Sequence, residues 1–327
     1  MGCDSKLVAD RDTILLWGPS SDPPLAAVAD ALRRAGCPLV FLDQHTVLDT
    51  QMSLSVSDTV AGELRLGNER LDLSSVKAVY LRPCDSRELP CVVDAGAGSA
   101  AWHHALALQD MMSSWCELTP ALALNRPIDM AANSSKPYQS MLIEAQGFRI
   151  PDTLLTTDPD AAAQFWRHHG RVIYKSLSAT RSIVSCVTDE HVARFDNIAN
   201  CPTQFQQYVE GTEYRVHVVG EDLLACAIQS TADDYRYTTE PVAMQACELP
   251  PDIATRCRRL AESMNLPLAG LDLRCTAEGT WYCFEVNPSP GFTYFQHATG
   301  QPITESIARL LQSAGTRAKP NTQTLPS

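Results

Sequence analysis

The sequence predicts a mixed fold, with an α/β region at the N-terminus followed by α+β units. In the first third of the chain, short apolar runs alternate with helical stretches, which is typical of α/β proteins. After about residue 204, strand patterns dominate and only two helices interrupt them. The 327 residues allow two or three domains, because one domain usually contains about 100 to 150 residues.

The first region is expected to span residues 1–128. Its predicted elements are strands at 13–17 and 38–42, a helix at 23–35, a hairpin at 63–73, a strand at 78–81, a helix at 100–116 and a strand at 122–125. The helix at 23–35 has prolines at its start, where they are tolerated. The turn of the hairpin is predicted at Gly67-Asn68. The pair Arg126-Pro127 indicates a boundary, because the residue before a proline disfavours helical backbone.

Two further units and a tail are expected, at residues 129–205, 206–314 and 315–327. The second unit has predicted helices at 136–146 and 160–168 and strands at 153–155, 171–176 and 182–187. The third has predicted strands at 204–209, 213–219, 223–229, 242–248, 270–275 and 280–286, with helices at 251–264 and 304–313. The tail is polar and contains two prolines, which predicts disorder.

Composition excludes several classes of partner. Acidic residues number 38 against 26 basic ones, and the net charge of -12 opposes binding to nucleic acid or to an anionic membrane. No apolar run reaches the roughly 20 residues that span a bilayer. The twelve cysteines form no Cys-x-x-Cys pair, and the first residues lack the apolar core of a signal peptide. We therefore expect a cytoplasmic protein whose cysteines are small core residues.

Two segments near the C-terminus carry a set of oxygen-bearing side chains. In a strand, residues two apart share a face, so Asp272 points with Arg274, and Glu285 points with Asn287. If the two strands pair through a turn at Glu278-Gly279, one surface gathers Asp272, Glu285 and Asn287. Hard oxygen ligands of this kind suit Mg²⁺, with Mn²⁺ as an alternative. The other interpretation is an ordinary solvated hairpin face.

These residues, with Glu285-Val-Asn287-Pro288, resemble the metal-binding signature of the ATP-grasp superfamily of carboxylate–amine ligases. Other landmarks follow in the family's chain order between residues 125 and 311. The resemblance implies an N-terminal pre-ATP-grasp domain and a two-subdomain ATP-grasp fold. In that fold the nucleotide binds between two antiparallel sheets.

The resemblance also implies the residues that bind ATP. Lys136 and Lys175 resemble the two ATP-binding lysines, and Glu213 resembles the acid that binds ribose hydroxyls. Residues 206–209 resemble the hinge whose backbone holds adenine. Many members cover the phosphates with a glycine-rich loop, whereas residues 176–182 contain no glycine. The complete implied set is Lys136, Lys175, Ser178, Arg181, Gln206, Gln207, Tyr208, Val209 and Glu213.

Within the superfamily, the chain looks most similar to the branch that contains microviridin-type peptide cross-linking ligases and ribosomal-protein glutamate ligases. The similarity lies in segments such as 79–83 and 299–303. It implies that ATP converts a substrate carboxylate into an acyl phosphate, which an amine then attacks to form an amide, or a hydroxyl to form an ester. Arg236 and Arg274 are implied to stabilise the oxyanion, and Arg215 is a third catalytic candidate because it shares the strand face of Glu213.

Alternatives remain open at this point. Arg82 is equally consistent with a substrate anchor and with a strand-end charge, and Arg236 is equally consistent with its catalytic role and with a surface charge. Glu213 could pair with Arg215 for purely structural reasons. The substrates are a peptide or small-molecule carboxylate and an amine, and a ligase of free amino acids is an alternative function. An inactive nucleotide-binding regulator is another, which the glycine-poor loop favours and the intact acid set opposes. The resemblance also implies a homodimer.

Overall fold

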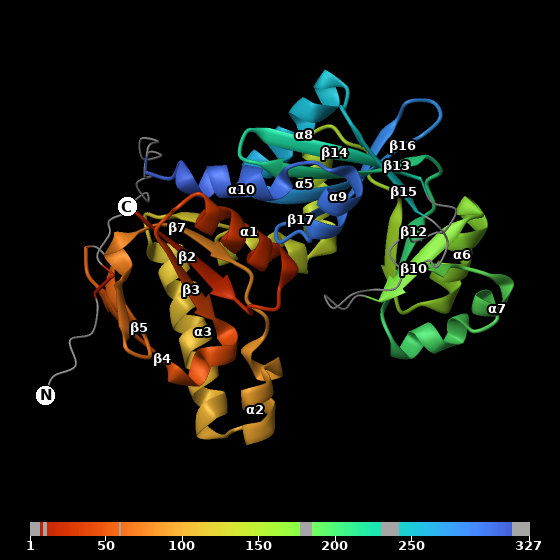
Figure 1. The fold of residues 1–327 in the computed structure, drawn as a ribbon. Coiled ribbons are helices and arrows are strands. Elements are labelled where there is room, and N and C mark those ends of the chain that lie inside the picture. The colour runs from red at the N-terminus through yellow and green to blue at the C-terminus, as the bar shows by residue number, and fades with distance from the viewer. Residues whose placement is uncertain (1–6, 9–11, 59, 177–184, 230–241, 316–327) are drawn as a thin grey trace, which may run out of the picture.

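The computed structural model describes residues 7–8, 12–58, 60–176, 185–229 and 242–315 (Figure 1). Its elements form one parallel sheet and two antiparallel sheets, with a small hairpin sheet beside the parallel one. The predicted combination of α/β and α+β architecture is therefore confirmed. The predicted disordered tail at 315–327 lies outside the described residues, except for Gly315.

The parallel sheet is built from the first third of the chain, in the order β3-β2-β7-β8. The strands are β2 (Thr13–Gly18), β3 (Leu39–Asp43), β7 (Val76–Leu81) and β8 (Leu122–Leu124). Both faces of β2 are covered by helices, which explains why its sequence is apolar at nearly every position.

One face of this sheet packs against α1 (Pro23–Arg34) and α10 (Ile303–Gln312), and the other against α3 (Ala100–Leu118). The last helix of the chain thus lies beside the first one, as Figure 1 shows. Asp22 caps α1 by accepting a hydrogen bond from Leu25 N at 2.8 Å. The core of the N-terminal region is therefore completed by residues from the C-terminal end.

The hairpin sheet has the order β1-β6-β5-β4. Its strands are β1 (Leu7–Val8), β4 (Thr50–Val56), β5 (Val60–Leu66) and β6 (Glu69–Asp72). The hairpin predicted at Gly67-Asn68 is confirmed, because Leu66 pairs with Glu69. We did not predict β4, since its sequence TQMSLSV is largely polar and only one residue of the strand is buried.

The middle sheet is antiparallel, in the order β11-β10-β12-β9. Its strands are β9 (Thr153–Thr156), β10 (Val172–Ser176), β11 (Ser185–Cys186) and β12 (Thr203–Gln207). One face packs against α6 (Pro159–His169) through Ala162, Phe195 and Phe205. In Figure 1 this sheet and α7 (Asp189–Val192) form the lobe on the right.

The C-terminal sheet is antiparallel, in the order β15-β14-β13-β16-β17. Its strands are β13 (Thr212–Val219), β14 (Asp222–Gln229), β15 (Ala243–Cys247), β16 (Leu268–Cys275) and β17 (Trp281–Asn287). One face is covered by α5 (Lys136–Ala145) and α8 (Pro251–Ser263). The opposite face is covered near Val219 by α10 and α9 (Thr293–Thr299), and farther along β13 it carries polar side chains.

Three properties complete the fold. The remaining α-helices of the described ranges are short: α2 (Pro90–Ala95) and α4 (Pro127–Met130). The cysteines within the described ranges are all free thiols. No helix in the part of the chain that the structure describes is long and apolar enough to cross a membrane.

Candidate active site

The predicted pairing of the two acid-bearing strands is confirmed. Asp272 on β16 lies directly opposite Glu285 on β17, and Gly270 lies opposite Asn287. Leu271 and Val286 point into the core beneath α5 and α8. Since side chains alternate between faces, the three oxygen-bearing side chains of Asp272, Glu285 and Asn287 share the other face.

A β-bulge lies next to this set. The register shifts so that Asp272 pairs with Glu285 but Leu273 pairs with Cys283. Cys283 and Val286 are both fully buried in the same core, so the two residues between them, Phe284 and Glu285, turn away from it. Bulges of this type often redirect side chains beside active sites. Simple alternation from Val286 would place Phe284 on the core face, whereas the bulge turns it to the other face.

Two ion pairs cross from β13 to β16 on this face. Arg215 Nη1 lies 2.5 Å from Asp272 Oδ1, and Glu213 pairs with Arg274. Each partner is the residue directly opposite in the register. The structural alternative in which Glu213 pairs with Arg215 is therefore wrong. Opposite residues in an antiparallel pair are about 5 Å apart, whereas residues two apart on one strand are separated by about 7 Å.

Arg215 is a buried cation that lies over a glycine. Only 6% of the residue is exposed, and a Cβ atom at Gly270 would lie 2.2 Å from Arg215 Nη2. The Arg215 guanidinium carbon also lies 5.4 Å from the centre of the Phe295 ring. Burying a guanidinium is costly unless an anion compensates it, so Arg215 and Asp272 depend on each other.

His217 follows Arg215 on the same face of β13. It is fully buried, and burial together with the charge of Arg215 holds its pKa well below the usual value. Its ring packs edge-on against Phe295, with 5.3 Å between the ring centres. His217 is therefore a neutral imidazole at physiological pH. His297 lies on α9 and is exposed.

Lys136 is the first residue of α5, and its ammonium group pairs with Glu285. The helix dipole opposes a cation at this end, and Ser135 makes no capping hydrogen bond there. Local helix stability therefore does not explain a lysine at this position, whereas its ion pair with Glu285 does.

Gln139 is a functional candidate that we did not predict from the sequence. It lies one helical turn after Lys136, and its side-chain amide makes two hydrogen bonds to the main chain of Val286. These bonds hold α5 against β17 next to Glu285. The sequence offers one signal for Gln139, which is that it lies one helical turn after Lys136. This spacing does not show which main-chain groups the side-chain amide would reach.

The middle sheet presents Lys175 to the side away from α6. Lys175 lies opposite Gln204, and Ile173 lies opposite Gln206, so these four residues share a face. Gln206 Nε2 donates to Thr153 Oγ1 at 3.0 Å. Gln207 points to the other face, and its Oε1 accepts a hydrogen bond from Asp152 N at 3.4 Å.

The predicted hinge, residues 206–209, begins inside β12, which ends at Gln207 and not at residue 209 as expected. The Tyr208 ring stacks beneath Arg171, with 3.5 Å from the guanidinium carbon to the ring centre. Val209 is buried, and its carbonyl oxygen accepts a hydrogen bond from Arg274 Nη1 at 2.5 Å. Arg274 thus connects the hinge to Glu213 and is itself nearly buried.

Three predicted site residues cannot be placed. Ser178, Arg181 and Arg236 lie outside the described residues. Across the described ranges, no group of three or more His, Cys, Asp or Glu side chains is arranged to hold a metal ion. The predicted metal set differs from such a group, because it combines two carboxylates with the amide of Asn287.

Arg82 connects the N-terminal sheet to the segment that follows β17. Its Nε donates to Asp22 Oδ1 at 2.8 Å, and its Nη1 donates to Ser289 Oγ at 3.0 Å and to the Pro290 carbonyl at 3.1 Å. Ser289 N in turn donates to Asn287 Oδ1 at 2.9 Å. These contacts favour a structural role for Arg82 over that of a substrate anchor.

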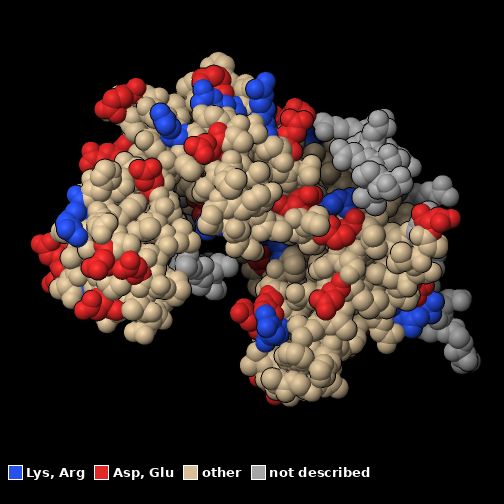
Figure 2. All heavy atoms as spheres, turned by 180° about the vertical axis from the view of Figure 1, so that it is seen from behind, with Lys and Arg blue, Asp and Glu red and all other residues tan. Residues whose placement is uncertain are grey.

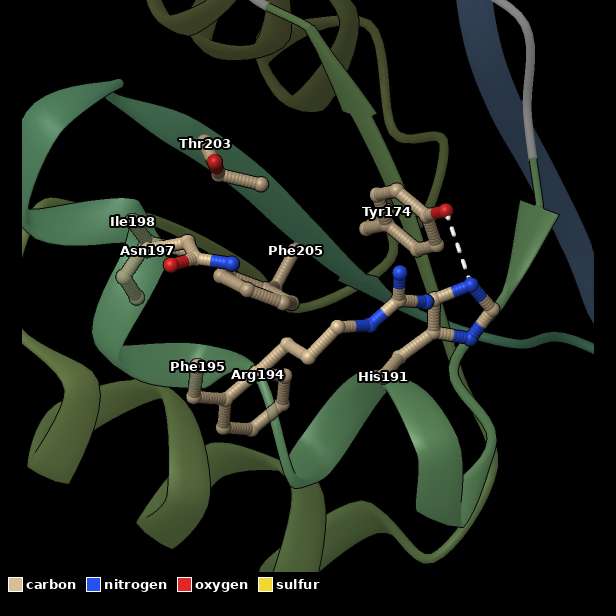
Figure 3. A pocket seen from close by; sticks show the side chains of 8 residues that line it. All are labelled: Tyr174, His191, Arg194, Phe195, Asn197, Ile198, Thr203 and Phe205. Carbon is tan, nitrogen blue, oxygen red and sulfur yellow. Dashed lines mark hydrogen bonds between the residues drawn. The ribbon is translucent and has the colours of Figure 1, made fainter.

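The outer face of the middle sheet carries a separate pocket of ≈ 220 Å³ near α7 (Figure 3). Aromatic rings of Tyr174, Phe195 and Phe205 form much of its wall, and Arg194 extends across it. Tyr174 Oη and His191 Nε2 are 3.1 Å apart. The pocket lies on the opposite side of the sheet from Lys175.

Seen from behind, a hollow separates the lobe of the middle sheet from the N-terminal lobe, with charged side chains of both signs around it (Figure 2).

Comparison with known proteins agrees with this geometry. The profile of the RimK-like ATP-grasp domain matches residues 133–311, which is more than half of the chain. A probable alpha-L-glutamate ligase from Shewanella loihica is 24% identical over 224 residues, covering 65% of this chain and 71% of that protein.

Two solved structures share the fold over nearly their whole length. The macrocyclase MdnC from Microcystis aeruginosa, bound with the precursor peptide MdnA, has a TM-score of 0.77 at 22% identity, covering 91% of this chain and 99% of that one. The ATP-grasp ligase PsnB, in complex with a variant of its minimal precursor, Mg and ADP, has a TM-score of 0.74 at 22% identity, covering 93% and 99%. At these identities the likeness shows a shared fold.

The fold and the family match together define an ATP-grasp enzyme of the ligase type. The chain belongs to the RimK-like ATP-grasp family. Members of this class couple ATP to the joining of a carboxylate and an amine, so this chain is an ATP-dependent carboxylate–amine ligase acting on a peptide or an amino acid.

Proposed function

We propose that this ligase uses MgATP to activate a carboxylate of a peptide and joins it to an amine of the same peptide. The observation that carries the proposal is the facing pair Asp272 and Glu285, each balanced by a basic side chain, beside Asn287. Two adjacent carboxylates arranged in this way are suited to bind a divalent cation. An ordinary solvated hairpin has no need of a buried arginine and a helix-terminal lysine against its acids.

The chemistry of these donors fits a magnesium ion. Asp272, Glu285 and Asn287 are the residues that would hold it, since Mg²⁺ prefers a few carboxylate and amide oxygens together with phosphate. Asn287 Oδ1 already accepts one hydrogen bond from Ser289 N, which leaves a second lone pair on that oxygen. When bound, the ion would neutralise part of the negative charge on the phosphates. Mn²⁺ has the same ligand preferences and is a weaker alternative.

The nucleotide is assigned to the space between the middle and C-terminal sheets. Lys175 on one side and Lys136 on the other provide cations for its phosphates, and residues 206–209 provide the hinge for the base. Arg215, held in place by Asp272, would face the negative charge that develops as the carboxylate is phosphorylated. Ser178, Arg181, Arg236 and Glu213 keep the roles that the family resemblance implies.

A peptide substrate is supported by the extent of the structural likeness. MdnC and PsnB, which are both seen with precursor peptides, match this chain far beyond residues 133–311 and include the N-terminal region. The aromatic pocket near α7 has the size and apolar walls to accept a side chain of a peptide. We propose the division into units 1–128, 129–205 and 206–314, and a homodimer, on the same resemblance.

Addition of a free amino acid to a peptide or protein is the second candidate. It is favoured by the curated relatives, such as the probable alpha-L-glutamate ligase from Shewanella loihica. The two candidates share the ATP site and differ in the amine that attacks.

The test is release of ADP by the full chain with ATP and Mg²⁺, followed by mass spectrometry of the acceptor. Three acceptor sets are compared: a leader-bearing peptide with acidic and lysine or hydroxyl side chains, a peptide with added glutamate, and free amino acids alone. Loss of water from the first peptide supports the proposal, whereas gain of an amino-acid residue supports the second candidate. Absence of ADP release with every carboxylate, in a protein that still binds MgADP, would favour the inactive regulator.

A further inference from the structure

Strand β17 is the outermost strand of its sheet, so one row of its main-chain groups faces away from β16. In its first half, this edge is covered by main chain. Arg149 N donates to the Trp281 carbonyl at 3.1 Å, and Cys283 N donates to the Arg149 carbonyl at 3.0 Å. At Val286 the cover is a side chain instead. Gln139 Nε2 donates to the Val286 carbonyl at 2.8 Å, and Val286 N donates to Gln139 Oε1 at 3.0 Å.

This contact is sealed from water. Gln139 is 1% exposed and Val286 is 0% exposed. A side-chain amide carries the same donor and acceptor as a peptide group, so Gln139 pairs with Val286 as a residue of another strand would. No other residue type has this pair of groups at this reach, because glutamate has no donor when ionised and asparagine is one methylene shorter.

Val286 lies between two of the predicted metal ligands, Glu285 and Asn287. Lys136, the partner of Glu285, lies one helical turn before Gln139 and on the same face of α5. A single amide therefore fixes the main chain that carries two ligands and also the helix end that carries the lysine.

We propose that Gln139 is a positioning residue for the magnesium–nucleotide site. It sets the place of Glu285 and Asn287 through the Val286 main chain, and it keeps Lys136 within reach of Glu285 and of a bound phosphate. The inference rests on the proposed function and goes beyond it. It assigns the positioning of the metal ligands to a residue that is not itself a metal or nucleotide ligand in the proposed site. Groups that orient metal ligands typically change metal affinity or activity about 10- to 100-fold when they are replaced.

The experiment compares Gln139→Met and Gln139→Glu with the wild-type full chain. Gln139→Met fills the same space without either hydrogen bond, and Gln139→Glu keeps the acceptor for Val286 N but loses the donor. Gln245→Met is the matched control, because Gln245 is exposed on β15, the opposite edge strand of the same sheet. Circular dichroism first establishes that each variant is folded at the temperature of measurement.

Calorimetry then measures the affinity for ADP as Mg²⁺ is varied. We expect Gln139→Met and Gln139→Glu each to bind MgADP about 10- to 100-fold more weakly than the wild type, and Gln245→Met to bind it unchanged. In turnover, the KM for MgATP should rise while the KM for the acceptor stays constant. If Gln139 has only a structural role, its replacement lowers the unfolding temperature and leaves the affinity of the folded variants for MgADP unchanged.

The outcomes separate this inference from the proposed function. Wild-type protein that takes up no MgADP removes the proposed function and this inference with it. Normal wild-type binding together with unchanged binding by folded Gln139→Met overturns the inference alone. If Gln139→Met does not fold, Gln139→Glu decides by the same criterion. Hydrogen exchange on the wild type needs no variant: Val286 N–H must exchange as slowly as the interior of the sheet, and rapid exchange refutes the contact.

Discussion

Replacement of Gly270 by alanine is the sharpest test of the candidate site. The added Cβ would lie 2.2 Å from Arg215 Nη2, 2.8 Å from Arg215 Cζ and 2.7 Å from Pro290 Cβ. All three distances are far below van der Waals contact, so the Arg215 guanidinium and Pro290 must shift, and we expect the shift to weaken the ion pair between Arg215 and Asp272. The backbone at Gly270 is ordinary strand, so the substitution adds steric conflict without conformational strain.

The cost follows from what Arg215 loses. Overpacking alone costs about 1 to 3 kcal/mol, and separating a buried ion pair costs about 3 to 5 kcal/mol when one partner stays buried. Asp272 is one-third exposed, so water offsets part of the second cost and we expect about 3 kcal/mol in total. For a chain of 327 residues that unfolds as one unit, this corresponds to a fall of about 4 °C in the unfolding midpoint. If Arg215 has the proposed catalytic role, ADP release should fall about 100-fold, because the displaced guanidinium would no longer face the transferred phosphate.

The assay is thermal unfolding together with ADP release, and Gly291→Ala is the control. Gly291 lies in the segment after β17, is exposed, and has open space where a Cβ would be added. We expect the Gly291→Ala protein to behave as the wild type. If Gly270→Ala and Gly291→Ala unfold at the same temperature and turn over ATP at the same rate, then Arg215 does not lie over Gly270 and the reasoning fails.

Three further outcomes are expected. Glu285→Gln should raise the Mg²⁺ concentration needed for half-maximal ADP release at least about 10-fold, and an unchanged Mg²⁺ titration would contradict its place among the metal ligands. Arg82→Met should lower stability by about 2 to 3 kcal/mol in denaturant unfolding, because it leaves the partly buried Asp22 carboxylate without its cation. Arg33→Met on the surface of α1 should cost under about 1 kcal/mol. His217 has a lowered pKa when folded, so below about pH 6.5 the unfolded chain binds the extra proton and stability falls as the pH decreases, by up to about 1.4 kcal/mol per pH unit. His217→Gln should flatten the stability profile between pH 7 and pH 5, and an identical profile would refute the buried neutral imidazole.

The sequence by itself determined the order of the elements and the face on which the acids lie. Alternation along residues 270–274 and 285–287 follows from strand geometry, and the common face of Asp272, Glu285 and Asn287 follows once the two strands pair through the predicted turn. The apolar runs of the parallel sheet were equally clear, because a strand buried on both faces needs apolar side chains throughout. Strand β4 was missed because only one of its residues is buried, so its sequence lacks an apolar run.

Only the tertiary structure decided which charges pair and which polar groups hold the site together. Arg215 pairs with Asp272, and Glu213 with Arg274, because the register of β13 against β16 places them opposite each other. The contact between Gln139 and Val286 depends on how a helix docks on a sheet edge about 150 residues later in the chain. Local sequence encodes backbone preference and which side chains share a face. The partner of a buried polar group depends on the packing of distant segments, and this is decided only when the whole chain has folded.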